Sequence, residues 1–124
     1  MADAPTTHYQ VTASTRPGGS GAVVQAQQAT IPFDGRAEAG DELPGPAELL
    51  CAALAACLLK NVERFSHLLP FRYEAASVTV SAERAEAPPR MVRMHYRLLV
   101  TTDEPDERLD LLHRNLRRHG TITN

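Results

Sequence analysis

The stretch PAELLCAALAACLL, residues 46–59, carries the strongest structural signal in this chain. Pro46 suits the first turn of a helix, where its missing N–H group is not needed, and Glu48 complements the positive end of the helix dipole. Residues 49–59 carry no polar side chain, and a helix that is apolar all round is buried all round. The stretch therefore predicts a central helix, from Pro46 to about Ser66, that other elements cover on all sides.

This predicted helix contains the only two cysteines of the chain, Cys51 and Cys57. Six helical residues separate their Cα atoms by about 9 Å along the axis and turn their side chains about 120° apart. A disulfide needs Cα atoms within about 7 Å, so we expect two free thiols. Cys57 is either a reactive thiol, which requires a nearby cation such as Lys60, Arg16 or Arg36, or a small apolar core residue. Cys51 is expected to be a packing residue.

The segments before the central helix predict a hairpin. His8–Thr15 alternates in character and favours a short strand, and Ala22–Ile31 favours a second one. The composition of Arg16–Gly21 is typical of a turn between them. Asp34–Gly45 is polar and predicts the loop that leads into the central helix.

The segments after the central helix predict a second hairpin and a final helix. Tyr73–Ala82 and Val92–Val100 alternate as half-buried strands do, with Glu86–Arg90 as the loop between them. Leu109, Leu112 and Leu116 form the apolar stripe of a last helix that Asp103–Pro105 opens and Gly120 ends. Strands in hairpins, combined with two helices, indicate antiparallel pairing and the α+β class.

Composition limits the partners of the chain. Its 124 residues suit one domain, 1–124, and the net charge of −2 with a pI of about 6.2 gives no electrostatic footprint for nucleic acid. The longest apolar run, Leu49–Leu59, is shorter than the roughly 20 residues that cross a bilayer, and residues 1–7 do not resemble a signal peptide. We therefore expect a soluble, cytoplasmic protein that binds neither nucleic acid nor membrane.

The histidines and arginines show no pattern of a metal or cofactor site. No spacing of the five histidines with cysteines or carboxylates matches a zinc site, so we expect neither a metal nor a cofactor. The histidines are expected to be solvated or partly buried, with His119 placed where the last helix approaches the central one. Arg114, Arg117 and Arg118 are expected to be exposed and to complement the dipole of the last helix.

The central stretch resembles the helix motif of the OsmC/Ohr family, which runs Asn-Pro-Glu-Glu-Leu-Leu, then small residues, then Ala-Ala-Cys. The order of strands and helices agrees with that family over nearly the whole chain. The resemblance implies an α+β fold, with an antiparallel sheet and a buried central helix, in which two chains intertwine as a homodimer. It also implies thiol peroxidase chemistry, in which one Cys attacks a hydroperoxide, becomes a sulfenic acid and is resolved by a second Cys.

The resemblance carries over to this chain only in part. It implies that Cys57 is the nucleophile. The family's Glu, which holds a thiolate-binding Arg, falls on Ala47, which leaves the adjacent Glu48 as the acidic candidate. Arg16 lies only near the position of the family's Arg. The second Cys falls on Gly120, and family members continue into a further strand, so the resemblance implies a domain that lacks a C-terminal strand.

The sequence is compatible with three functions. The leading one is an OsmC-like stress-response redox protein that reduces an organic hydroperoxide with Cys57 alone and is regenerated by an external thiol. The alternative is a non-catalytic relative that binds a small apolar ligand between the central helices at the dimer interface. A structural or interaction domain is the third.

Overall fold

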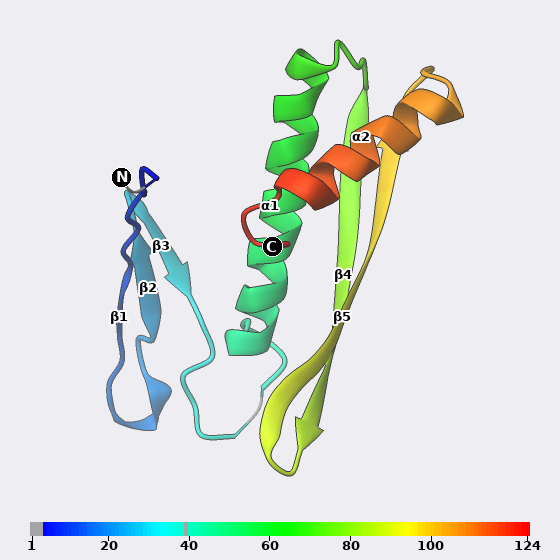
Figure 1. Cartoon of the computed structure of the whole chain (residues 1–124). Coiled ribbons are helices and arrows are strands. Elements are labelled where there is room, and N and C mark those ends of the chain that lie inside the picture. Colours follow the sequence, from blue (N-terminus) through cyan, green and yellow to red (C-terminus); the bar gives the residue numbers. More distant parts are fainter. Residues whose placement is uncertain (1–3, 39) are drawn as a thin grey trace. The chain divides into compact units, whose positions relative to one another are not determined.

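The computed structural model describes residues 4–38 and 40–124, so position 39 of the predicted loop lies outside the described residues (Figure 1). The chain divides into two compact units, Met1–Pro46 and Ala47–Asn124. Both pair their strands antiparallel and the second adds two helices, which confirms the predicted α+β class.

The first unit is a sheet of three short strands, in the order β1 (Thr12–Ser14), β2 (Val23–Ala26) and β3 (Ala29–Pro32). The single strand predicted over Ala22–Ile31 is therefore wrong. The chain reverses at Gln27, whose φ is +53°, and Ala26 pairs with Ala29. A Gln-Gln pair lacks the Asn-Gly signal of such tight turns, which is why the sequence pattern missed it. The strand predicted from His8 begins only at Thr12.

At Gly19 and Gly35 the turn after β1 contacts the loop that follows β3. Gly19 ends a short 3-10 helix, η1 (Pro17–Gly19), with a φ of +76°. A Cβ atom at Gly19 would lie 2.5 Å from the carbonyl carbon of Gly35, so the two backbones touch where only glycine fits. The predicted turn is confirmed, and this contact holds the start of the 34–45 loop against it.

The second unit consists of two helices and one long hairpin. Its elements are α1 (Pro46–Leu68), β4 (Ala75–Glu86), β5 (Pro89–Thr101) and α2 (Asp106–His119). The central helix and the last helix are thus confirmed. The loop predicted over Glu86–Arg90 is wrong, because Glu86 pairs with Pro89 and only two residues form the turn. The register of the hairpin shifts between Glu83 and Arg84, which leaves Val92 without a pairing partner.

Both helices pack on one face of the β4–β5 hairpin (Figure 1). Leu58 and Val62 of α1 and Leu112 and Leu116 of α2 are at most 1 % exposed. The hairpin contributes alternate residues to this core, because successive strand residues point to opposite faces. These residues are Ala76, Val78, Val80, Tyr96, Leu98 and Val100.

The other face of α1 is exposed in the single chain. Leu50 is 43 % exposed, and Ala52, Ala53 and Ala56 are exposed as well. These four residues are called the apolar face of α1 below. The sequence predicts burial on all sides of this helix, whereas the single chain leaves this apolar face uncovered.

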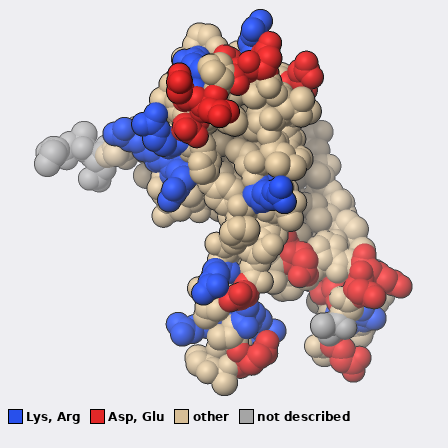
Figure 2. All heavy atoms as spheres, turned by 90° about the vertical axis from the view of Figure 1, so that its right-hand side faces the viewer, with Lys and Arg blue, Asp and Glu red and all other residues tan. Residues whose placement is uncertain are grey.

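Charged side chains of both signs are intermixed on the side of the molecule shown in Figure 2. Toward the upper end of the view acidic and basic groups lie next to one another, whereas the group of charged side chains at the left edge below them is basic. Among the described residues, no helix has both the length and the apolar character that crossing a membrane requires.

Candidate thiol site

Cys57 lies in the middle of α1, half-buried and not disulfide-bonded. Asn61, one turn further along, donates from Nδ2 to the Cys57 carbonyl oxygen at 3.1 Å and contacts the Cys57 sulfur at 3.6 Å. Asn61 is only 9 % exposed. A buried amide that faces a sulfur is a hydrogen-bond donor placed where a thiolate would accept.

Asn61 is a neighbour of the candidate thiol that the sequence interpretation missed. Its signal is nevertheless present, because Asn61 lies within the buried stripe of Leu54, Leu58 and Phe65. A polar residue in an apolar stripe needs a partner, and the cysteine one turn earlier provides it. Lys60, which the sequence offered as a cation for Cys57, is exposed and makes no hydrogen bond to the sulfur within the described residues 47–124.

Cys51 has different surroundings. It is also free and half-buried, which confirms that the two cysteines do not pair. Cys51 lines a groove of about 430 Å³ between the first half of α1 and the inner face of the hairpin. Glu48 and Arg84 line the same groove, whereas Cys57 does not. The acidic candidate Glu48 is therefore brought near Cys51 rather than near the predicted nucleophile.

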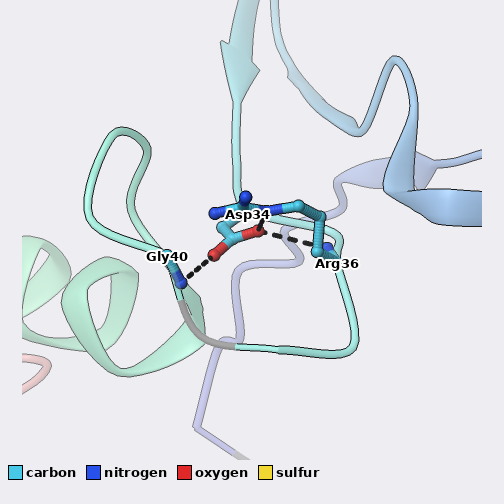
Figure 3. A network of polar contacts seen from close by, with 3 residues as sticks. All are labelled: Asp34, Arg36 and Gly40. Carbon is cyan, nitrogen blue, oxygen red and sulfur yellow. Dashed lines mark hydrogen bonds and ion pairs between the residues drawn. The ribbon is translucent and has the colours of Figure 1, made fainter.

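A second polar arrangement lies in the first unit, in the loop before α1 (Figure 3). The carboxylate of Asp34 accepts from the backbone N and the Nε of Arg36, both at 3.1 Å, and from the backbone N of Gly40 at 2.8 Å. The hydrogen bonds from Arg36 lower the pKa of Asp34, and Asp34 in turn raises the pKa of Arg36. Both groups are thus charged, and the carboxylate fixes the direction of the guanidinium.

Arg16, the other candidate cation, belongs to the same unit. Its side chain is exposed, and its backbone closes the turn by bonding to Gly19 and Ser20. Among the described residues, Arg16 forms no ion pair. Arg36 is therefore the oriented arginine of this unit and Arg16 the unoriented one.

The C-terminal half of α1 carries a polar cluster of its own. Glu63 accepts a short hydrogen bond from the Tyr73 hydroxyl and lies 2.9 Å from Nε2 of His67. Tyr73 and then His67 lower the pKa of Glu63, while the carboxylate raises the pKa of Tyr73. Glu63 and His67 are exposed, whereas Tyr73 is half-buried and packs against the core.

The histidines and basic residues of α2 lie largely where the sequence predicts. His119 stacks near Phe65 of α1 with ring centroids 5.6 Å apart, which confirms that the end of α2 approaches the central helix. His113 is half-buried and bonds to Tyr96. Arg114, Arg117 and Arg118 are exposed. Within residues 4–38 and 40–124, no group of three or more His, Cys, Asp or Glu side chains could hold a metal ion.

Comparison with known proteins links this geometry to one family. A family profile described as OsmC-like protein matches residues 39–124. No curated protein matches the sequence. Solved structures match the fold closely, although their sequence identities are low.

Three of these structures illustrate the likeness. An OsmC-like protein from Mycoplasma pneumoniae has a TM-score of 0.84 at 16 % identity, over 95 % of this chain and 86 % of that one. The organic hydroperoxide resistance protein OsmC from Legionella pneumophila gives 0.69 at 16 % identity, over 96 % and 90 %. The organic hydroperoxide resistance protein OhrB of Bacillus subtilis gives 0.61 at 19 % identity, over 94 % and 88 %.

Proposed function

Since the chain belongs to the OsmC family, we propose that it is a redox protein that reduces organic hydroperoxides with one cysteine, Cys57. The observation that carries this proposal is the environment of the sulfur. Cys57 is free and half-buried, and the buried amide of Asn61 faces its Sγ atom. Two of the similar structures are organic hydroperoxide resistance proteins, which supports the choice of substrate class.

The reaction proceeds in two stages with balanced electrons. The Cys57 thiolate attacks one oxygen of the hydroperoxide, an S–O bond forms, and the O–O bond breaks. The other oxygen leaves with its alkyl group, takes up a proton and becomes an alcohol, while Cys57 becomes a sulfenic acid. One external thiol then releases water and forms a mixed disulfide, and a second external thiol frees Cys57 and leaves as the disulfide of the reductant.

An external reductant is required because the chain offers no second thiol in reach. Cys51 is the only other cysteine, six residues earlier on the same helix. Their Cα atoms are about 9 Å apart along the axis, whereas a disulfide needs about 7 Å or less. Gly120 takes the position that a resolving Cys has in the family motif, so an outside thiol takes over that step.

A thiolate needs a cation to stabilise it, and the chain offers two arginines as candidates, Arg36 and Arg16. The Asp34 carboxylate already orients the Arg36 guanidinium, and an oriented guanidinium holds an anion at less entropic cost than a mobile one. Replacing Arg36 with Gln should lower the rate of hydroperoxide reduction on the order of a hundredfold, the usual cost of losing an electrostatic partner in a reaction site. Arg16→Gln is the matched control; if it causes the larger loss, Arg16 holds the thiolate instead.

The proposed working form is a homodimer. The apolar face of α1, at Leu50, Ala52, Ala53 and Ala56, is exposed in the single chain. Alanines let helices approach closely, and a face of this kind on a central helix fits a second copy of itself across a twofold axis. Burial by a partner would also complete the covering that the sequence predicts for this helix.

The test of the proposed reaction compares the two cysteines. Cys57→Ser should abolish the consumption of tert-butyl hydroperoxide in the presence of dithiothreitol, whereas Cys51→Ser should keep the wild-type rate. Dimedone, which labels sulfenic acids, should label Cys57 and not Cys51 after one addition of the hydroperoxide. A wild-type rate no higher than that of Cys57→Ser would disprove the peroxidase function.

A second candidate function is favoured by the groove that Cys51 lines. Ala47, Ala55, Val80, Ala82 and Met91 give this groove of about 430 Å³ largely apolar walls, the usual character of a ligand site. In this function the protein binds a small apolar ligand without turning it over. An apolar ligand that raises the melting temperature of wild type and Cys57→Ser equally, with no hydroperoxide turnover, would support it. Loss of that stabilisation on Ala55→Trp, which fills the groove, would locate the ligand there.

A further inference from the structure

A separate cavity lies between β5 and α2. It measures about 520 Å³, a volume that suits a small organic molecule. Leu98 and Val100 of β5 and Leu109 and Leu112 of α2 form apolar walls. Cys51 and Cys57 do not line it, so neither the proposed peroxidase site nor the Cys51 groove accounts for this cavity.

A fixed polar pair forms one wall of this cavity. The Tyr96 hydroxyl lies 2.7 Å from Nε2 of His113, and the two rings meet edge to face at 5.8 Å. Both residues are half-buried. Because each ring holds the other in place, the wall exists before any ligand binds, and a preformed wall lowers the entropic cost of binding.

The charged groups on α2 give the cavity two unlike ends. Asp110 and Arg117 both line it and are seven residues apart, which is about 10 Å along a helix. Within the part of the chain that the structure describes, neither side chain forms an ion pair. One end of the cavity therefore presents the exposed, unpaired guanidinium of Arg117, and the other presents the exposed, unpaired carboxylate of Asp110.

From this arrangement we propose that the cavity binds a small aliphatic monocarboxylic acid. The hydrocarbon part lies along the apolar walls, and the carboxylate meets the guanidinium of Arg117 beside the Tyr96–His113 pair. A guanidinium pairs with a carboxylate through two parallel hydrogen bonds, which favours an acid over an alcohol. Asp110 repels a second carboxylate at the far end, so the site selects monoacids over diacids.

Octanoate is a suitable probe, with octan-1-ol and octanedioate as comparisons, and isothermal titration calorimetry of the full chain is the measurement. We expect octanoate to bind about tenfold more tightly than either comparison, the equivalent of about 1.4 kcal/mol for one charge-assisted contact. Arg117→Gln should weaken octanoate binding by a similar factor. Arg118→Gln removes the neighbouring exposed charge, which does not line the cavity, and should leave binding unchanged.

Three results would overturn this proposal. The first is that octanoate gives no heat of binding. The second is that octanoate and octan-1-ol bind with equal affinity. The third is that Arg117→Gln and Arg118→Gln weaken octanoate binding equally. The measurement is independent of the peroxidase reaction, because Cys57→Ser should bind octanoate as the wild type does. Octanoate binding without hydroperoxide turnover would therefore contradict the proposed function alone, and turnover without octanoate binding would contradict only this site.

Discussion

The two halves of α1 both carry leucines but have opposite surroundings. The C-terminal half packs against α2 and the hairpin, with Leu58 and Val62 at most 1 % exposed. The N-terminal half borders the groove at Cys51 and exposes its apolar face, where Leu50 is 43 % exposed. Leucine side chains therefore stabilise the single chain in one half, whereas in the other half Leu50 is available for a partner or ligand.

The largest expected effect is a loss of stability from the C-terminal half. Leu58→Ala should lower the free energy of unfolding by about 3 kcal/mol, because it leaves a cavity in a fully packed core. Urea denaturation at one fixed protein concentration measures this change. Leu68, on the same helix, is 61 % exposed, and Leu68→Ala should change stability by less than about 0.5 kcal/mol. Equal effects of the two variants would contradict the contrast between packed and exposed positions.

The N-terminal half should instead affect assembly. Leu50→Glu places a charge in the proposed contact between two α1 helices, so the dimer should weaken about a hundredfold, or about 2.7 kcal/mol. Sedimentation velocity over a concentration series measures the dissociation constant. Thr79→Glu, at an exposed position of β4, adds the same charge elsewhere and should leave the dimer intact. A monomeric wild type would contradict the proposed homodimer.

A smaller effect is expected from Asn61, the residue that contacts the Cys57 sulfur. Asn61→Leu removes the amide that faces the sulfur but keeps the volume of the side chain, so hydroperoxide reduction should slow about tenfold. Asn115 of α2 makes the same kind of bond, from Nδ2 to the Leu111 carbonyl at 2.9 Å, but has no sulfur beside it. Asn115→Leu should leave the rate unchanged. Stopped-flow measurement of both variants decides whether Asn61 acts on the reaction or only on the fold.

The same contrast explains which parts of the molecule could be predicted from the sequence. α1 and α2 followed from apolar runs and from proline and glycine at their ends, which are local signals. The β2–β3 turn was missed because Gln27 adopts a positive φ, which a glutamine in the sequence does not indicate. The Glu86–Pro89 pairing was missed because a proline-rich tip resembles a loop. In each case the pairing between strands determines the structure, and this pairing cannot be predicted from the sequence of one strand alone.

The candidate site was predictable to a similar extent. Cys57 could be singled out because it lies in a recognisable motif. Asn61 required knowing which stripe of α1 is buried, and the Asp34–Arg36 pair required the loop conformation. The charged neighbours of Cys51 could not be predicted, because Arg84 comes from a strand more than thirty residues later in the chain.

The smallest expected effect is a pH dependence at the end of the C-terminal half. Tyr73 and His67 lower the pKa of Glu63 below its ordinary value of 4.5 in the folded state. A carboxyl group with a lowered folded-state pKa stabilises the fold above its unfolded value, and this stabilisation is lost as the pH falls through the lowered pKa. The melting temperature of Glu63→Gln should therefore lie slightly below that of wild type at pH 7, and the two should converge as the pH drops below 4.5.

Glu74→Gln removes an exposed carboxylate that makes no ion pair among the described residues, so it should follow the wild-type curve at every pH. A constant gap between wild type and Glu63→Gln across this range would mean that the cluster acts through packing of Tyr73 rather than through the charge of Glu63.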